Sequence, residues 1–353
     1  MRFSLPKSLS QRFSREIGID LGTANTLVYL KGKGIVVNEP SVVAVNQKTG
    51  QVVAVGSAAR DMLGRTPGHI IAVKPLVEGV ISDFEVTEEM ISYLIGKAQG
   101  EKTTFGPRVV IGVPSGVTNV EIRAVRDAAE NAGAREVYII EEPMAAALGA
   151  RLPVHDPVGT MIVDIGGGTT DIALISLGGI VRAKNIRIAG DVLNQDIAAY
   201  IRSEFKILIG DRTAEEVKLA VGSVMKPTIP LEATIRGRDL VTGLPREIVV
   251  TDADVREAIG PSIGSIIEAI KEVIESAPPE VVADVMREGV YLTGGGALLR
   301  GLPELLASEL NVPLHVVDDP LTTVVRGTGM VLEDVDKYRS VLVDDDEGTL
   351  SGF

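Results

Sequence analysis

The sequence contains no cysteine and no tryptophan, only three histidines, and aromatic residues make up 3% of it. The absence of cysteine excludes disulfides, thiolate metal sites and cysteine nucleophiles, and it is typical of a reducing compartment. The histidines His69, His155 and His315 are too far apart in the sequence to form a metal-binding motif. The longest stretch without a charged residue, the twelve residues from Val109 to Val120, is too short to cross a bilayer.

What the chain does have is an ordinary globular composition with an acidic balance. Of its 353 residues, 45% are apolar and 24% are charged, with a formal net charge of −13. At about 100–200 residues per domain, this length predicts two domains. A nucleic-acid-binding protein needs a basic surface, so we expect no nucleic-acid partner.

The positive charge is concentrated at the N-terminus. Residues 1–15 carry +4 and the other 338 residues carry −17; the four basic residues are Arg2, Lys7, Arg12 and Arg15. No apolar run follows them, so no cleaved secretory signal is expected. Two interpretations stay open: an amphipathic segment for an anionic membrane surface, or a frayed terminus with incidental apolar residues. The apolar side chains of this segment are Phe3, Leu5, Leu9 and Phe13.

Strand and helix patterns alternate along the chain. Strands are expected within Glu16–Leu30 and over Ile35–Val45, with a glycine turn between them, and again over Val290–Thr293. Apolar spacing predicts helices over Val192–Lys206 and Asp252–Glu275, among others. This alternation favours an α/β class in which helices cover sheets.

An internal repeat is the most informative feature. Ile17–Thr26 aligns with Met161–Thr170 at an offset of 144 residues, and aspartate, glycine and threonine coincide at 20/164, 22/166 and 26/170. Each copy continues into a strand, a glycine turn and another strand. Two such halves predict a pseudo-twofold molecule with a cleft between two lobes.

Each copy places an aspartate near the end of an apolar strand, followed by a tight glycine-bearing turn. Backbone amides in such turns can face an anion, so two facing turns would bind a polyphosphate from both sides. Asp20 and Asp164 would then lie where Mg²⁺ needs hard oxygen partners, through its waters. The alternative is that both copies are plain hairpin turns that require glycine.

Other nucleotide and nucleophile motifs fail. A P-loop ends in Gly-Lys-Ser or Gly-Lys-Thr, and Gly96-Lys97-Ala98 lacks both the hydroxyl and the earlier glycine. A dinucleotide fingerprint needs a third glycine that neither glycine-rich stretch supplies. In Gly112-Val113-Pro114-Ser115-Gly116 the serine stands one position too late for a nucleophile elbow.

Longer strings resemble the actin, Hsp70 and sugar-kinase ATPase superfamily, and within it the MreB family of bacterial actins. The resemblance covers about residues 16–335. The strings that carry it are Asp20-Leu21-Gly22-Thr23-Ala24-Asn25-Thr26, Lys31-Gly32-Lys33-Gly34-Ile35, Asn38-Glu39-Pro40-Ser41, Gly64-Arg65-Thr66-Pro67-Gly68, Ile139–Ala147 and Thr293–Arg300.

This resemblance implies an actin-like (ribonuclease H-like) α/β fold: two similar lobes, each with a mixed sheet flanked by helices, plus smaller inserted subdomains. The expected division is a basic segment 1–15, lobe I over 16–155 completed by 322–340, lobe II over 156–321, and an acidic tail 341–353. The inserted subdomains are expected at about 35–75 and 192–250.

The resemblance also implies roles for individual residues. It implies catalytic roles for Glu142, which would orient the attacking water, and for Thr170 near that water. The alternative role of Glu142 is that of an acid at a helix N-terminus that complements the helix dipole. This alternative explains the neighbouring Glu141 better. Asp20 and Asp164 would serve Mg²⁺. The nucleotide-binding set is Gly22, Thr23, Ala24, Asn25, Gly166, Gly167, Gly168, Thr169, Glu215, Glu216, Lys218, Gly294, Gly295, Gly296, Ala297 and Leu298. One departure is Asp171, where most chains of this family have glutamate.

The implied function is an ATPase with ATP and Mg²⁺ that forms homopolymeric filaments on the inner face of the cytoplasmic membrane and helps determine rod shape with cell-elongation membrane proteins. A metabolite kinase and a chaperone-type ATPase of the same superfamily are the alternatives. The localisation implied is cytoplasmic and peripheral to the membrane. Phe105 resembles the tip of an exposed loop that enters lipid, although inward packing explains it equally well.

Overall fold

The computed structural model describes residues 15–65, 68–100 and 106–343. Its first large sheet has five strands, and the pairs at its centre are both parallel and antiparallel. In spatial order the strands are β3 (Gly34–Pro40), β2 (Asn25–Leu30), β1 (Glu16–Leu21), β9 (Arg108–Val113) and β10 (Glu136–Glu141).

The second large sheet repeats this topology. Its order is β13 (Gly179–Ile186), β12 (Thr170–Ser176), β11 (Thr160–Ile165), β17 (Val290–Thr293) and β18 (Leu314–Val316). In each sheet the first three strands are antiparallel and the last three are parallel. The predicted duplication into two similar lobes is therefore confirmed, and we call them lobe I and lobe II.

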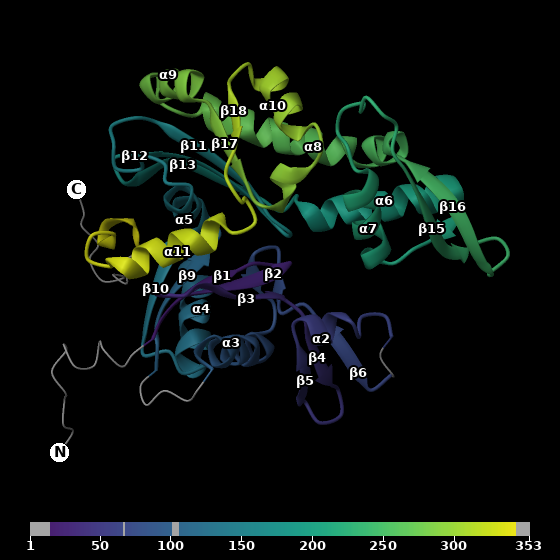
Figure 1. The fold of residues 1–353 in the computed structure, drawn as a ribbon, viewed down its shortest axis with the longest axis horizontal. Helices are drawn as coiled ribbons and strands as arrows, with labels where there is room; N and C mark the ends of the chain where they lie inside the picture. Colours follow the sequence, from purple (N-terminus) through teal and green to yellow (C-terminus); the bar gives the residue numbers. More distant parts are fainter. Residues whose placement is uncertain (1–14, 66–67, 101–105, 344–353) are drawn as a thin grey trace.

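Helices form three layers around these two sheets (Figure 1). The outer face of the first sheet packs on α3 (Phe84–Gln99) and α4 (Asn119–Asn131). A middle layer, α5 (Glu142–Gly149) and α11 (Thr323–Glu333), contacts both sheets. The outer face of the second sheet packs on α8 (Asp252–Glu275), α9 (Pro279–Glu288) and α10 (Leu302–Leu310). Beside them, α6 (Gly190–Phe205) packs on α8, and α7 (Asp211–Val221) packs on α6.

The middle helices approach each other at backbone distance. A Cβ at Gly149 would stand 1.9 Å from the Thr323 carbonyl oxygen, and one at Gly327 would stand 1.8 Å from that of Ala145. Only glycine permits this contact. The chain reaches lobe II after α5 and returns before α11, so the middle layer also holds both connections between the lobes.

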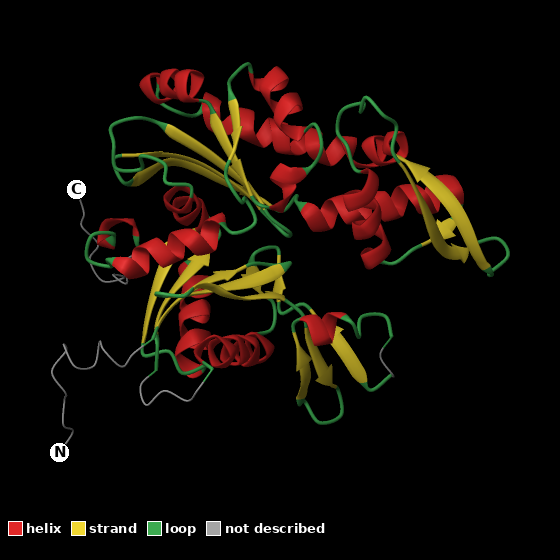
Figure 2. Cartoon of the chain, viewed as in Figure 1, coloured by secondary structure: helices red, strands yellow, loops and turns green. Residues whose placement is uncertain are grey.

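Each lobe carries a smaller sheet (Figure 2). In lobe I it consists of β5 (Val52–Val55), β4 (Val43–Asn46) and β6 (Ile70–Val73), beside α2 (Ser57–Arg60), and a short ribbon β7 (Leu76–Val77) with β8 (Val80–Ile81) follows. In lobe II it consists of β14 (Ile207–Leu208), β15 (Glu232–Asp239) and β16 (Pro245–Thr251).

One predicted strand is wrong. The expected strand over Ile35–Val45 is two strands, because β3 ends at Pro40 and β4 begins at Val43. The chain turns between them: the Val42 amide donates to the Pro40 carbonyl, and the Ser41 hydroxyl donates to the Gly22 carbonyl. By contrast, the predicted bounds of α8 and β17 agree with the structure.

The described residues also include two short 3₁₀ helices. One is η1 (Gly295–Leu298), beside the second sheet, and the other is η2 (Arg339–Val341), near the C-terminal end of the described chain. Leu342 and Val343 then pair with β10. Among the helices of the described residues, none combines the length and the apolarity that a bilayer span requires.

Candidate functional site

A cleft of about 400 Å³ lies between the lobes, and both repeated segments line it. Most of the predicted site residues contribute to its wall. Those residues are Asp20, Gly22, Thr23, Ala24, Asn25, Glu142, Asp164, Gly166, Gly167, Gly168, Thr169, Glu215, Lys218, Gly294, Gly295, Gly296 and Leu298. Strand ends, helix starts and glycine turns from both lobes therefore converge on one cavity.

We call Gly22–Asn25 the first turn and Gly166–Thr169 the second turn. They lie against each other across the cleft: a Cβ at Gly167 would stand 2.5 Å from the Ala24 Cβ, and one at Gly168 would stand 2.6 Å from the Thr23 Oγ1. The missing side chains at these two glycines allow the backbones of the turns to approach. Both turns can therefore present amides to the same bound anion.

The turns sit at equivalent places in the two sheets. Asp20 pairs in register with Gly112 of β9, and Asp164 pairs with Thr293 of β17. Each aspartate thus lies at the carboxyl end of a central strand, beside a parallel neighbour. Open α/β sheets bind ligands beyond the carboxyl ends of their strands, which is where the cleft lies.

Three carboxylates stand at the base of the cleft: Asp164 is buried, and Asp20 and Glu142 are half-buried. Burial raises the pKa of Asp20 to about 7. Burial, together with the charges of Asp171 and Asp20, also raises the pKa of Glu142 and of Asp164 well above the usual values. Such a group of acids favours a bound cation, because a cation would offset their mutual repulsion.

These oxygens fit a hard cation such as Mg²⁺. Within the described ranges, no group of three or more His, Cys, Asp or Glu side chains is arranged to hold a metal ion directly. The donor set therefore fits an ion that keeps several waters and reaches Asp20 and Asp164 through them, as Mg²⁺ commonly does.

The two predicted catalytic residues differ in position. Glu142 is the first residue of α5, followed by Pro143 in the first turn of the helix, and its side chain reaches the cleft. Thr170 is fully buried behind the second turn, where its Oγ1 donates to the Ile188 carbonyl at 2.7 Å. It is not among the residues that line the cleft.

Residues of α7 in lobe II, among them Glu215 and Lys218, also line the cleft. Lys218 Nζ lies 3.0 Å from Glu215 Oε2 and donates to the Gly190 carbonyl at 3.0 Å. Glu216, the next residue along, points elsewhere: it is exposed, pairs with Arg212 at 3.1 Å and is outside the lining. Ala297 is buried within η1 and is also outside the lining.

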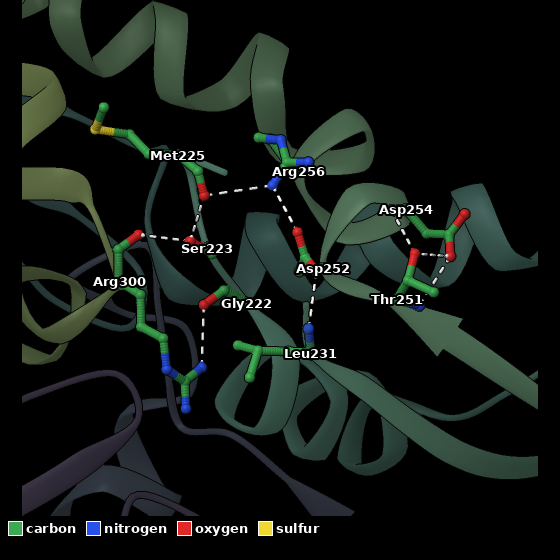
Figure 3. A network of polar contacts seen from close by, with 9 residues as sticks. All are labelled: Gly222, Ser223, Met225, Leu231, Thr251, Asp252, Asp254, Arg256 and Arg300. Atoms are coloured by element: carbon green, nitrogen blue, oxygen red, sulfur yellow. Dashed lines mark hydrogen bonds and ion pairs between the residues drawn. The ribbon is translucent and has the colours of Figure 1, made fainter. Parts of the chain in front are cut away.

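A polar network supports the wall formed by Gly222 and Arg300 (Figure 3). The Arg300 guanidinium donates to the Gly222 carbonyl at 3.1 Å, and the Ser223 hydroxyl donates to the Met225 carbonyl at 2.6 Å. Arg256 joins this segment to α8, since it donates to the same Met225 carbonyl and pairs with Asp252 at 2.9 Å. The end of α7 is thereby fixed to the start of α8.

The sequence did not reveal the contacts that join the lobes around the cleft. Lys74 Nζ pairs with Asp191 at 2.8 Å, and Arg187 pairs with Glu78 at 2.7 Å. Asp171 of β12 accepts from the Ser115 amide of lobe I at 2.8 Å. These partners are 56 to 117 residues apart, so no local pattern links them.

Asp171 is thus a contact between the lobes. Burial raises its pKa to about 6, although hydrogen bonds from Asn185 and Ser115 oppose the shift. The predicted membrane residues Phe3, Leu5, Leu9, Phe13 and Phe105 lie outside the described residues.

Comparison with known proteins places the chain among bacterial cytoskeletal proteins. The family model described as MreB/Mbl protein matches residues 14–340. The cell shape-determining protein Mbl of Bacillus subtilis (strain 168) is 51% identical over 325 residues, covering 92% of this chain and 98% of the relative. The cell shape-determining protein MreB of Escherichia coli (strain K12) is 47% identical over 337 residues, covering 94% and 97%.

Solved structures of similar fold point to the same family. MreB5 of Spiroplasma citri bound to AMPPNP superposes with a TM-score of 0.88 at 40% identity, covering 92% of this chain and 97% of that one. The MamK double helical filament superposes with a TM-score of 0.78 at 25% identity, covering 91% and 99%. The expected actin-like fold is therefore confirmed, and the chain belongs to the MreB/Mbl family.

Proposed function

We propose that this chain binds Mg²⁺-ATP between its lobes, hydrolyses it, and polymerises into filaments that help determine rod cell shape. The observation that supports this most directly is the contact between the two duplicated turns across one cleft. Solved structures of MreB5 from Spiroplasma citri, bound to AMPPNP and to ADP, support a nucleotide as the ligand.

In this proposal the amides of the first and second turns hold the β- and γ-phosphates from opposite sides. Glu215 and Lys218 would contact the ribose and adenine, and η1 with the preceding Gly294 would approach the adenosine, where glycines allow close backbone contact. Glu216 and Ala297 then act as neighbours of this set.

Asp20 and Asp164 would hold Mg²⁺ through its waters, and the bound ion would supply positive charge opposite the phosphates. Glu142 would accept a hydrogen bond from the attacking water and align it with the γ-phosphate. Thr170 would support this arrangement from behind the second turn. No covalent intermediate is needed, because positioning and electrostatic stabilisation supply the catalysis.

ATP binding would serve assembly. The relatives are named cell shape-determining proteins, and MamK is solved as a double helical filament. A head-to-tail contact between identical subunits that does not close produces a filament. We propose that such filaments organise cell-wall elongation together with membrane proteins of that machinery.

Sedimentation and electron microscopy of the purified full chain test this proposal. We expect filaments that pellet with Mg²⁺-ATP, and release of phosphate during the assay. A chain that stays monomeric in every nucleotide, or that transfers phosphate to a sugar, would contradict the cytoskeletal function.

We also propose that the filaments lie on the inner surface of the cytoplasmic membrane, through residues 1–15 and Phe105. Co-sedimentation with anionic liposomes should compare the full chain, a chain that lacks residues 1–15, and Phe105→Ser. The truncated chain should pellet less with liposomes than the full chain. Equal pelleting would show that the N-terminal segment is not the anchor.

A further inference from the structure

We infer that Ser41 is a positioning residue for the first turn: its hydroxyl orients the peptide between Gly22 and Thr23 so that the Thr23 amide faces the phosphates. The inference rests on the proposed function, because it assigns Ser41 a part in holding the β- and γ-phosphates.

Ser41 holds two carbonyls of the first turn. Its Oγ donates to the Gly22 carbonyl at 2.5 Å, and its backbone amide donates to the Ala24 carbonyl at 3.0 Å. Ser41 itself is fully buried, in the connection between β3 and β4, so it reaches the turn from behind while the turn lines the cleft.

The hydrogen bond from Ser41 to the Gly22 carbonyl sets the direction of the Thr23 amide. In a trans peptide the carbonyl oxygen and the following N–H point in opposite directions. Because the Gly22 carbonyl points to Ser41, the Thr23 N–H points away from Ser41. Gly22 and Thr23 line the cleft and Ser41 does not, so we infer that this N–H faces the cleft. Without the hydroxyl, nothing on the Ser41 side chain would resist rotation of this peptide.

A second buried hydroxyl completes the support. Thr26 Oγ1 and Ser41 Oγ are 2.9 Å apart. Since the single hydroxyl proton of Ser41 goes to the Gly22 carbonyl, Thr26 must be the donor in this pair. Both side chains are fully buried, so water cannot replace a bond that is removed.

The second turn is held differently. Its Gly166 and Gly167 carbonyls accept from the amides of Gly190 and Asp191, at 3.2 and 2.7 Å, where α6 begins. Both donors are backbone groups, which side-chain substitution does not remove. In the second turn these two carbonyls therefore rest on backbone donors, whereas in the first turn the Gly22 carbonyl rests on the side chain of Ser41.

The test is the preference for ATP over AMP, since AMP lacks the phosphates that the first turn would hold. Dissociation constants of both nucleotides with Mg²⁺ should be measured for the full chain, Ser41→Ala and Ser262→Ala. Ser262 is the matched control: it is also buried and donates at 2.5 Å, but to Asp196 and away from the cleft.

We expect Ser41→Ala to bind ATP roughly tenfold more weakly, as the loss of one hydrogen bond predicts, with AMP affinity unchanged. Thr26→Val should weaken ATP binding in the same direction, and Thr26→Ser, which keeps the hydroxyl, should restore it. Ser262→Ala should retain the wild-type preference, even if its unfolding temperature falls.

If the wild-type chain binds Mg²⁺-ATP and both Ser41→Ala and Thr26→Val keep its preference for ATP over AMP, the role of Ser41 is overturned and the proposed function is not. Absence of any nucleotide binding by the wild-type chain would overturn the proposed function itself. The two failures are therefore distinguished by the wild-type titration.

Discussion

Gly167 and Ala24 meet across the cleft so closely that a Cβ on Gly167 would stand 2.5 Å from that of Ala24. One residue belongs to lobe II and the other to lobe I, in corresponding turns of the repeat. The distance between these two residues therefore reports how far the lobes are apart at the two turns.

Gly167→Ala should separate the two turns and weaken Mg²⁺-ATP binding. The added methyl overpacks the contact, which typically costs about 1–3 kcal/mol. A fluorescence titration with ATP measures the effect. Gly264→Ala in α8 is the matched control, because nothing lies within 4 Å of its Cβ position, and it should bind ATP as wild type does. Wild-type affinity in Gly167→Ala would mean that the turns part freely.

Glu142→Ala should keep ATP binding and lose most ATP turnover. Removing a residue that aligns or activates water typically lowers the rate by about 10²–10⁴-fold. Binding and phosphate release should be measured on the same preparation, with Glu141→Ala as the neighbouring control. If binding and turnover fall together, the role of Glu142 is structural.

Removal of the magnesium ion should weaken ATP binding more in the wild-type chain than in Asp20→Asn. The carboxylate of Asp20 would hold waters of the ion, and the amide that replaces it carries no charge. Titrations with ATP in excess Mg²⁺ and in EDTA give the comparison. A variant that keeps the full magnesium dependence would refute this placement of the ion.

The buried acid Glu39 should make stability depend on pH. Burial alone would raise its pKa, but hydrogen bonds from Lys97 and Ser57 lower the pKa below the ordinary 4.5. A carboxylate with a lowered pKa in the folded state stabilises the fold above the ordinary pKa, and this contribution is lost as the pH falls.

Glu39→Gln should therefore lower the free energy of unfolding by about 1–3 kcal/mol at pH 7, and the difference from wild type should shrink below about pH 4.5. Urea unfolding at both pH values measures it. Glu89→Gln, on the exposed side of α3, should be neutral at both. A difference that is constant with pH would show that the charge of Glu39 contributes nothing.

The duplicated turns were predictable because each is written in a short stretch of sequence. Asp20 and Gly22, like Asp164 and Gly166, are two residues apart, and the flanking strands alternate with glycine turns. Long apolar periodicity likewise gave the bounds of α8. Local patterns of this kind determine the local structure, so the turns and the helix bounds can be predicted without knowledge of the whole fold.

Contacts that depend on three-dimensional packing were not predictable. The sequence of α11 contains Val324, Val325, Gly327 and Gly329, all of which are poor helix formers. Close packing on α5 nevertheless makes this segment helical. Glu215 and Glu216 are adjacent acids on α7, but a helix turns about 100° per residue, so only Glu215 faces the cleft.

The two chain connections beside α5 and α11 restrict how the lobes can move. A body tied to another at two neighbouring places can only rotate about the line that joins them, and displacement grows with distance from that line. Atoms near Gly149 and Gly327 would hardly shift, whereas the ion pairs Lys74–Asp191 and Glu78–Arg187 would break first. Opening of the lobes would therefore act on these two ion pairs, while the close contact of α5 with α11 would persist.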